Sequence, residues 1–270
     1  MPVDRQQLRY STPAQLALEQ GLIDRALNTR AGQVGMADER QVTRALSARP
    51  TLSDEQRAMI VRLCRDGDGV AVVAGRAGTG KTFALGAARE AWQAAGHSVL
   101  GVATARRAAA ELRDGADIAS TSTFALLADL RGGVGRLPRG CVLVVDEAGM
   151  VATREIAELA EHVGAVEGKL VLVGDHRQLP ELQAGGVFRA LVARGLAIEL
   201  TENVRQVHAW ERRALDQLRD GQPEPALAAY AEHDRLTVAA TGDAARERLV
   251  ADWVAAGDPQ GGGDDLPAAS

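Results

Sequence analysis

The chain has 270 residues, of which 46% are hydrophobic, 25% charged and 3% aromatic, which excludes collagen-like and wholly disordered proteins. No apolar run reaches the ~18 residues of a membrane span, and the N-terminus lacks the apolar segment of a secretory signal. With only two cysteines and a net charge of −5, we expect a cytoplasmic protein, with no membrane segment, that does not coat nucleic acid through bulk basicity.

Residues 1–64 are predicted to form a helical N-terminal extension. Apolar residues such as Leu16, Leu22 and Ile23 follow a 3.6-residue period. Ser53, ahead of a further apolar stretch, is typical of a residue that caps the start of a helix.

From residue 70 the pattern changes to short apolar runs that alternate with helical stretches. The predicted strands are residues 70–74, 98–104, 141–145, 170–173 and 197–200. The predicted helices between them are residues 81–95, 105–113, 122–130, 153–163 and 186–194. Because the runs are apolar on both faces, as in parallel strands covered by helices, the predicted fold class is α/β with a parallel sheet flanked by helices.

Beyond this region the chain looks incomplete as a domain. It has helical stretches at residues 209–219, 223–232 and 243–256, and a short apolar run at residues 236–239. We therefore predict a main domain over residues 65–206, a fragmentary second part over residues 207–256, and a tail over residues 257–270. The tail is rich in Gly, Pro and Asp, so we expect it to be disordered.

The strongest motif is GRAGTGKT, between the first predicted strand and the helix after it, which matches G-x-x-x-x-G-K-[ST]. Glycines allow successive backbone N–H groups to surround phosphate oxygens, where a side chain at Gly78 or Gly80 would obstruct them. Lys81 is expected to reach the β- and γ-phosphates, and the Thr82 hydroxyl to bind Mg²⁺. The predicted nucleotide-binding residues are Gly75, Arg76, Ala77, Gly78, Thr79, Gly80, Lys81, Thr82 and Phe83. The alternative is a chance glycine-rich turn, although Lys81 is one of only two lysines in the chain.

A second motif ends the strand at residues 141–145 with two acids, Asp146 and Glu147. The carboxyl end of a parallel strand would bring both carboxylates beside the phosphate loop. Asp146 can hold Mg²⁺ through water, and Glu147 can polarise an attacking water, which a protein that only binds nucleotide does not need. The alternative is a pair of solvated acids at a strand end.

Two further motifs follow later strands. GDHRQLP contains Gln178, whose neutral amide can bond both the γ-phosphate and the attacking water, and the alternative for this segment is a simple turn. LTENVRQ contains Arg205, which can stabilise charge on the transferring phosphoryl group. In isolation, an arginine after a strand is more often a surface residue.

In this order, GRAGTGKT, VVDEAGM, GDHRQLP and LTENVRQ resemble the first motor domain of superfamily-one helicases, in particular the RecD/TraA-like branch found in MobF-type conjugative relaxases. The resemblance covers about residues 8–206. It implies a RecA-like P-loop NTPase fold, ATP and Mg²⁺ as cofactors, and single-stranded DNA as the partner. It also implies that Gln56 reads the adenine edge and that Arg205 is an arginine finger.

Two segments correspond to DNA-contact motifs of this family, where hydroxyl and guanidinium groups suit backbone phosphates. The residues implied are Thr104, Arg106, Arg107, Thr121, Ser122 and Thr123. The alternative for the arginines is a solvated helix face. For Phe124, which follows the second segment, core packing is favoured over a stacking role.

The later motifs of the family, which belong to a second motor domain, and the relaxase nicking domain do not occur in these residues. We therefore predict the ATP-hydrolysing first half of a DNA helicase or translocase, which requires a second motor domain or a partner chain and hydrolyses ATP weakly alone. Two alternatives stay open. One is a truncated module that binds nucleotide or DNA without coupling them, and the other is a P-loop switch or kinase unrelated to DNA.

Overall fold

The computed structural model describes residues 11–176, 186–204, 206, 208–255 and 257. The chain divides into two compact units, residues 1–205 and residues 206–270.

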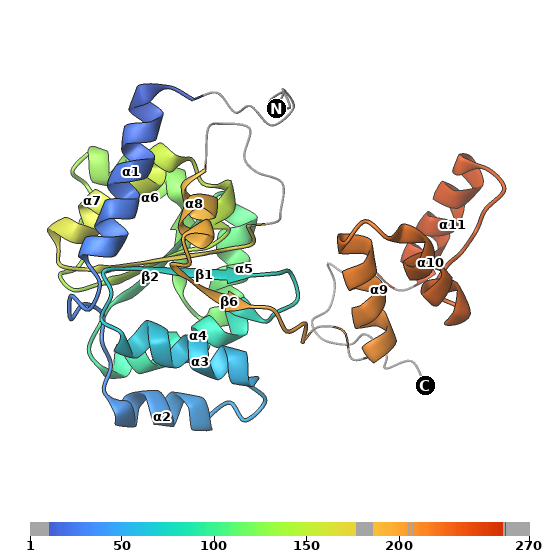
Figure 1. Ribbon diagram of the computed structural model, residues 1–270, viewed down its shortest axis with the longest axis horizontal. Coiled ribbons are helices and arrows are strands. Elements are labelled where there is room, and N and C mark those ends of the chain that lie inside the picture. The colour runs from blue at the N-terminus through green and yellow to red at the C-terminus, as the bar shows by residue number, and fades with distance from the viewer. Residues whose placement is uncertain (1–10, 177–185, 205, 207, 256, 258–270) are drawn as a thin grey trace, which may run out of the picture. The chain divides into compact units, whose positions relative to one another are not determined.

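The first unit is built on a sheet of six parallel strands in the order β3-β2-β4-β5-β1-β6 (Figure 1). The strands are β1 (Val70–Gly75), β2 (Val99–Ala103), β3 (Ala119–Ser122), β4 (Val142–Val145), β5 (Lys169–Gly174) and β6 (Ala197–Leu200). β1, β4 and β5 are buried along their whole length, as expected for central strands covered on both faces. β5 pairs with both β1 and β4, so the carboxyl ends of these three strands lie together at one edge.

Helices cover both faces of the sheet. One face carries α2 (Glu39–Ser47), α3 (Asp54–Arg65), α4 (Lys81–Ala94) and α5 (Arg106–Ala116). The other carries α1 (Pro13–Asn28), α6 (Thr123–Arg131), α7 (Thr153–Ala165) and α8 (Val187–Ala193). In Figure 1, α1, α7 and α8 lie on one side of the strands, with α2, α3 and α4 on the other. Of the helices predicted before residue 65, α1 and α3 contact the strands from opposite faces, whereas α2 packs on α3 and α4.

Helix α3 begins at a capping box. The Ser53 hydroxyl accepts a hydrogen bond from the Gln56 N–H (3.3 Å), and the Gln56 Oε1 accepts one from the Ser53 N–H (3.0 Å). This exchange satisfies two N–H groups that a helix end otherwise leaves without partners. It fixes where α3 begins, and that position matters for the site described below.

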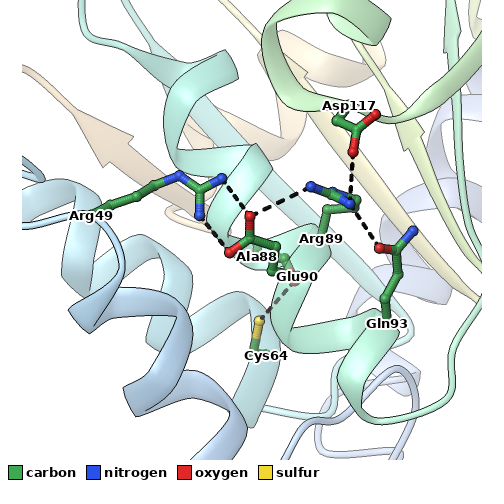
Figure 2. Close-up of polar contacts among 7 residues, drawn as sticks. All are labelled: Arg49, Cys64, Ala88, Arg89, Glu90, Gln93 and Asp117. Atoms are coloured by element: carbon green, nitrogen blue, oxygen red, sulfur yellow. Dashed lines mark hydrogen bonds and ion pairs between the residues drawn. The ribbon is translucent and has the colours of Figure 1, made fainter.

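Charged side chains tie the connection before α3 to helix α4 (Figure 2). Both terminal nitrogens of the Arg49 guanidinium donate to the Glu90 carboxylate, at 2.7 and 2.8 Å. Hydrogen bonding to Arg49 is the main reason why the pKa of Glu90 lies below its usual range. Arg89 links the same carboxylate to Asp117. The start of α3 is thereby held against the helix that follows the first strand.

The structure confirms the five strands and the intervening helices predicted from periodicity, within a few residues. It adds β3, whose sequence ASTS contains no apolar run and which lies at the edge of the sheet with exposed alternate residues. An edge strand of this kind carries no hydrophobic signal. The apolar run at residues 236–239 forms no strand.

The second unit contains three helices in its described residues, α9 (Ala209–Arg219), α10 (Pro223–Glu232) and α11 (Gly242–Ala255). Trp210 stacks on His233 with ring centroids 3.9 Å apart and meets Tyr230 edge-on at 5.4 Å. These rings join α9 to the α10 region. Across the described part of the whole chain, no helix has the length and apolar character needed to cross a bilayer.

Candidate functional site

The loop after β1 is shaped by glycines. Gly78 and Gly80 adopt left-handed backbone angles, with φ of 87° and 70°, which strongly favour glycine. A β-carbon on Gly80 would also collide with the Gln56 side chain, and one on Gly75 would lie 2.9 Å from the Thr79 hydroxyl oxygen. Helix α4 begins directly after Gly80, so its first N–H groups, which have no partner within the helix, are available to an anion.

Lys81 lies over this loop. Its ammonium donates to the carbonyl oxygens of Gly75 (2.7 Å) and Arg76 (3.2 Å), and the Thr79 hydroxyl also donates to the Arg76 carbonyl (2.9 Å). The loop is therefore closed by its own side chains. Because hydrogen bonds between charged groups are stronger than bonds to neutral carbonyls, a phosphate oxygen can replace the two lysine contacts.

Asp146 and Glu147 follow β4 and are half-buried. The Glu147 N–H donates to Asp146 Oδ1 (2.9 Å), and Glu147 has a left-handed φ of 51°, a conformation that is uncommon for a residue other than glycine. Burial raises the pKa of both carboxyls, and the charge of Asp146 raises that of Glu147 further, while Lys81 opposes both shifts. A bound cation would favour the charged forms of both.

A cavity of about 450 Å³ joins the loop and the acids. Its lining consists of Ala77, Gly78, Gly80, Lys81, Thr82, Glu111, Asp146, Glu147 and Val204. The structure thus brings together the side chains of Lys81, Thr82, Asp146 and Glu147, from two different strand ends, beside the predicted loop residues Ala77, Gly78 and Gly80. A hydroxyl and carboxylates are the oxygen donors that Mg²⁺ prefers, so the residues present fit this ion beside a phosphate.

Glu111, a third carboxylate in the cavity, belongs to no motif that the sequence displays. It lies on α5, one helical turn before Gly115, where a β-carbon would be 2.8 Å from the Thr82 methyl carbon. Residues one turn apart share a helix face, so this close packing turns Glu111 toward the cavity. Gly115 lies beyond the helix predicted over residues 105–113, so the sequence pattern gave no signal for this approach.

Gln56 packs against the phosphate loop at Gly80 and is only 2% exposed. Its Nε2 donates to the Thr79 carbonyl oxygen (2.8 Å), and its Oε1 accepts the hydrogen bond from the Ser53 N–H in the capping box. Both ends of the amide are therefore used within the protein, and contact with adenine stays a prediction. Phe83 lies beneath Arg49, whose guanidinium carbon is 5.7 Å from the ring centroid.

Two predicted catalytic residues, Gln178 and Arg205, lie outside the residues that the structure describes. Nearby residues show where their segments start. After burial and Asp146, the charge of Asp175 is a further cause of the raised pKa of Glu147, so the end of β5 lies close to this carboxyl. The Val204 N–H donates to the Gly78 carbonyl oxygen (2.9 Å), so the segment after β6 reaches the phosphate loop.

The first predicted DNA-contact segment follows β2. Thr104, Arg106 and Arg107 are exposed at the carboxyl edge of the sheet. The Arg107 side chain is 92% exposed, and its Nε lies 3.1 Å from Glu111 Oε1. An exposed pair of this kind is weak, so the guanidinium is available to an external anion.

The second predicted DNA-contact segment follows β3, which pairs with β2. Thr121 is exposed, whereas Ser122 caps α6 by accepting from the Ala125 N–H (3.2 Å). Thr123 is 2% exposed, and its hydroxyl donates to the Ala103 carbonyl, so this group is used inside the protein. The core packing expected for Phe124 is wrong, because its side chain is 73% exposed.

Residues 51–241 match the family described as AAA domain. The chain belongs to this family. It is 38% identical over 247 residues to the conjugal transfer protein TraA of Rhizobium radiobacter and 38% identical over 248 residues to that of Agrobacterium fabrum. Each alignment covers 91% of this chain, which spans only 22% of the length of either relative. The resemblance to TraA-like conjugative proteins that the four motifs indicated is confirmed.

Two solved structures are also similar to this chain. One is the Bacteroides sp Pif1 in complex with ADP-AlF4 (21% identity, TM-score 0.41, 63% of this chain and 46% of that chain). The other is the arterivirus nonstructural protein 10 helicase with DNA (15% identity, TM-score 0.38, 56% and 40%). At these TM-scores, neither adds to what the sheet itself shows of the fold.

Proposed function

We propose that this AAA domain binds Mg·ATP and hydrolyses it as the first motor domain of a DNA helicase or translocase from a conjugative relaxase. The observation that carries this proposal is the single cavity in which a loop lysine, a hydroxyl and the Asp146 and Glu147 carboxylates meet. The names of the relatives, which are conjugal transfer proteins, support the process in which we place it.

The proposed chemistry assigns each group in the cavity a role. Lys81 and the start of α4 bind the β- and γ-phosphates, and Thr82 and Asp146 would hold Mg²⁺. The ion supplies charge neutralisation at the phosphate oxygens. Glu147, held beside Asp146 by its own N–H group, accepts the proton of the attacking water. Gln178 orients that water and Arg205 stabilises the transferring phosphoryl group, as the motifs imply.

Single-stranded DNA is proposed to bind across the ends of β2 and β3. Thr104, Arg106, Arg107 and Thr121 are exposed there, and hydroxyl and guanidinium groups of this kind contact phosphate without reading sequence. In the complete motor, ATP would close a second domain over the strand and hydrolysis would release it. The second motor domain is expected from the rest of the protein or from a partner chain.

The test is ATP hydrolysis in Mg²⁺ with and without single-stranded DNA, comparing the wild-type chain with Lys81→Ala. We expect DNA to stimulate turnover, and Lys81→Ala to abolish nucleotide binding or turnover because the loop then offers no cation to the phosphates. Arg139→Ala, which removes an exposed arginine paired with Glu167, serves as the control. Unchanged turnover in Lys81→Ala would remove the central assignment.

The same assay separates the alternatives. ATP binding without turnover would indicate a module that does not couple nucleotide to DNA. Turnover that ignores DNA would indicate a P-loop switch or kinase.

A further inference from the structure

The segment after β6 runs beside the phosphate loop. β6 is an edge strand that pairs with β1, and Leu200 is the register partner of Gly75, the first residue of the loop. The chain that leaves β6 therefore continues next to the chain that leaves β1. This neighbourhood follows from the parallel register alone.

Glu55, on the first turn of α3, holds this segment. Its Oε2 accepts hydrogen bonds from the N–H groups of Thr201 (2.7 Å) and Glu202 (2.9 Å), and its Oε1 accepts one from the Thr201 hydroxyl (2.5 Å). Partial burial raises the pKa of Glu55, but these hydrogen bonds outweigh it and hold the pKa below its usual value. The charged carboxylate also lies where a helix N-terminus favours negative charge.

The adjacent side chain, Gln56, holds the phosphate loop through the Thr79 carbonyl. The segment and the loop are also joined directly, by the bond from the Val204 N–H to the Gly78 carbonyl. Together these contacts form a closed circuit, which we call the α3 clasp: Glu55, Gln56, Gly78, Thr79, Thr201, Glu202 and Val204.

The clasp is attached to atoms that respond to a nucleotide. Each peptide unit is planar, so drawing the Gly80 N–H toward a phosphate reorients the Thr79 carbonyl on the same unit. That carbonyl is the acceptor for Gln56. The N-terminus of α3, which carries Glu55 and Gln56, is held in place in two ways. It begins at a capping box, and the connection before it is bonded to α4 through Arg49 and Glu90.

We propose that Glu55 is a positioning residue that couples the nucleotide state of the phosphate loop to residues 201–204, and so to Val204 in the cavity lining. Nucleotide in the loop tightens the clasp and orders this segment, while an empty loop holds it less firmly. This inference rests on the proposed function, since it requires ATP to bind the loop.

The test compares Glu55→Gln with Asp54→Asn, which makes the same change of charge one residue earlier on the same helix turn. Hydrogen exchange is measured on peptides covering residues 75–82 and 199–204, with and without a non-hydrolysable ATP analogue and Mg²⁺. In wild type and Asp54→Asn we expect the analogue to protect both peptides. In Glu55→Gln the loop should still be protected, while the 199–204 peptide exchanges about tenfold faster and ignores the analogue.

Kinetics provide the second readout. Glu55→Gln should lower kcat about tenfold with the ATP Kd within about threefold of wild type, because Lys81 and the loop glycines are untouched. If Glu55→Gln does not fold, Thr201→Val removes one of the three donors and should give the same pattern at smaller amplitude. A 199–204 peptide that responds to nucleotide in these variants as it does in wild type would overturn the proposal.

The two proposals fail in different ways. If the analogue does not protect residues 75–82 in wild type, nucleotide binding and the proposed function fail. If those residues are protected but the 199–204 peptide does not respond, only the coupling through Glu55 fails.

Discussion

The carboxyl ends of β1 and β4, here called the central edge, differ from those of β2 and β3, the two strands at one end of the sheet order, here called the outer edge. At the central ends, side chains are half-buried and bonded to nearby groups, as with Lys81 on two loop carbonyls. At the outer ends, arginines extend into solvent, with Arg107 92% exposed. The side chains at the central ends are fixed before a ligand binds, and catalysis requires such preorganised groups. The outer ends offer charge without fixed geometry, which suits binding to any nucleic-acid sequence.

The sharpest test of this comparison is Glu147→Gln, which replaces a carboxylate at the central edge with an amide of nearly the same shape. We expect hydrolysis to fall roughly 10²- to 10⁴-fold, because the amide cannot accept a proton from water. ATP affinity should stay near that of wild type, because the loop and Lys81 are unchanged. Turnover and equilibrium nucleotide binding are both measured.

The control for this change is Glu167→Gln, the same substitution at an exposed carboxylate paired with Arg139. It should leave both quantities unaltered. An equal loss of binding and hydrolysis in Glu147→Gln would count against its role as the base, and would remove the distinction between a chemical edge and a binding edge.

The same contrast explains what could be predicted from the sequence. At the central edge, backbone geometry restricts residue type, since Gly78 and Gly80 adopt positive φ and glycine is the residue that does so without strain. Glycines at such positions form a motif that can be recognised in the sequence. The buried strands are equally readable, because a run such as VLVV at β4 is covered on both faces.

At the outer edge the sequence leaves more open, because hydroxyls serve several purposes. Three neighbouring hydroxyl residues have three different roles. Thr121 is exposed, Ser122 caps a helix and Thr123 donates to a buried carbonyl. Only the packing of α6 against the sheet separates these roles. The position of Glu111 in the cavity could not be predicted for a related reason, since it depends on the contact between Gly115 and Thr82.

A smaller effect is expected from replacing Arg106 and Arg107 with alanine at the outer edge. Binding of single-stranded DNA should weaken, and the slope of log K against log salt should fall by about 0.7 for each phosphate that the protein no longer neutralises. Nucleotide binding without DNA should not change, because neither guanidinium lines the cavity. Fluorescence titrations at several salt concentrations measure the slope, with Arg139→Ala as the control. An unaltered slope would make both residues ordinary surface arginines.

The smallest effect, and the one that tests whether the two edges communicate, is expected from Glu111→Gln. Glu111 lines the nucleotide cavity and also pairs with Arg107, so DNA that captures Arg107 changes the charge balance near Asp146. Removing the carboxylate should tighten DNA binding about 1.5- to fivefold, the range of an exposed ion pair. It should also reduce the stimulation of ATP hydrolysis by DNA. In the variant, DNA that binds Arg107 no longer breaks an ion pair with a carboxylate in the nucleotide cavity.

Asp114→Asn is the matched control for Glu111→Gln, since Asp114 lies on the same helix and pairs with Arg113 away from the cavity lining. Its DNA affinity and its stimulation ratio should equal those of wild type. If Glu111→Gln also leaves both quantities unchanged, α5 does not connect the edges. Coupling between the nucleotide site and the DNA-contact segments would then have to run through the segment held by Glu55 or through the second motor domain.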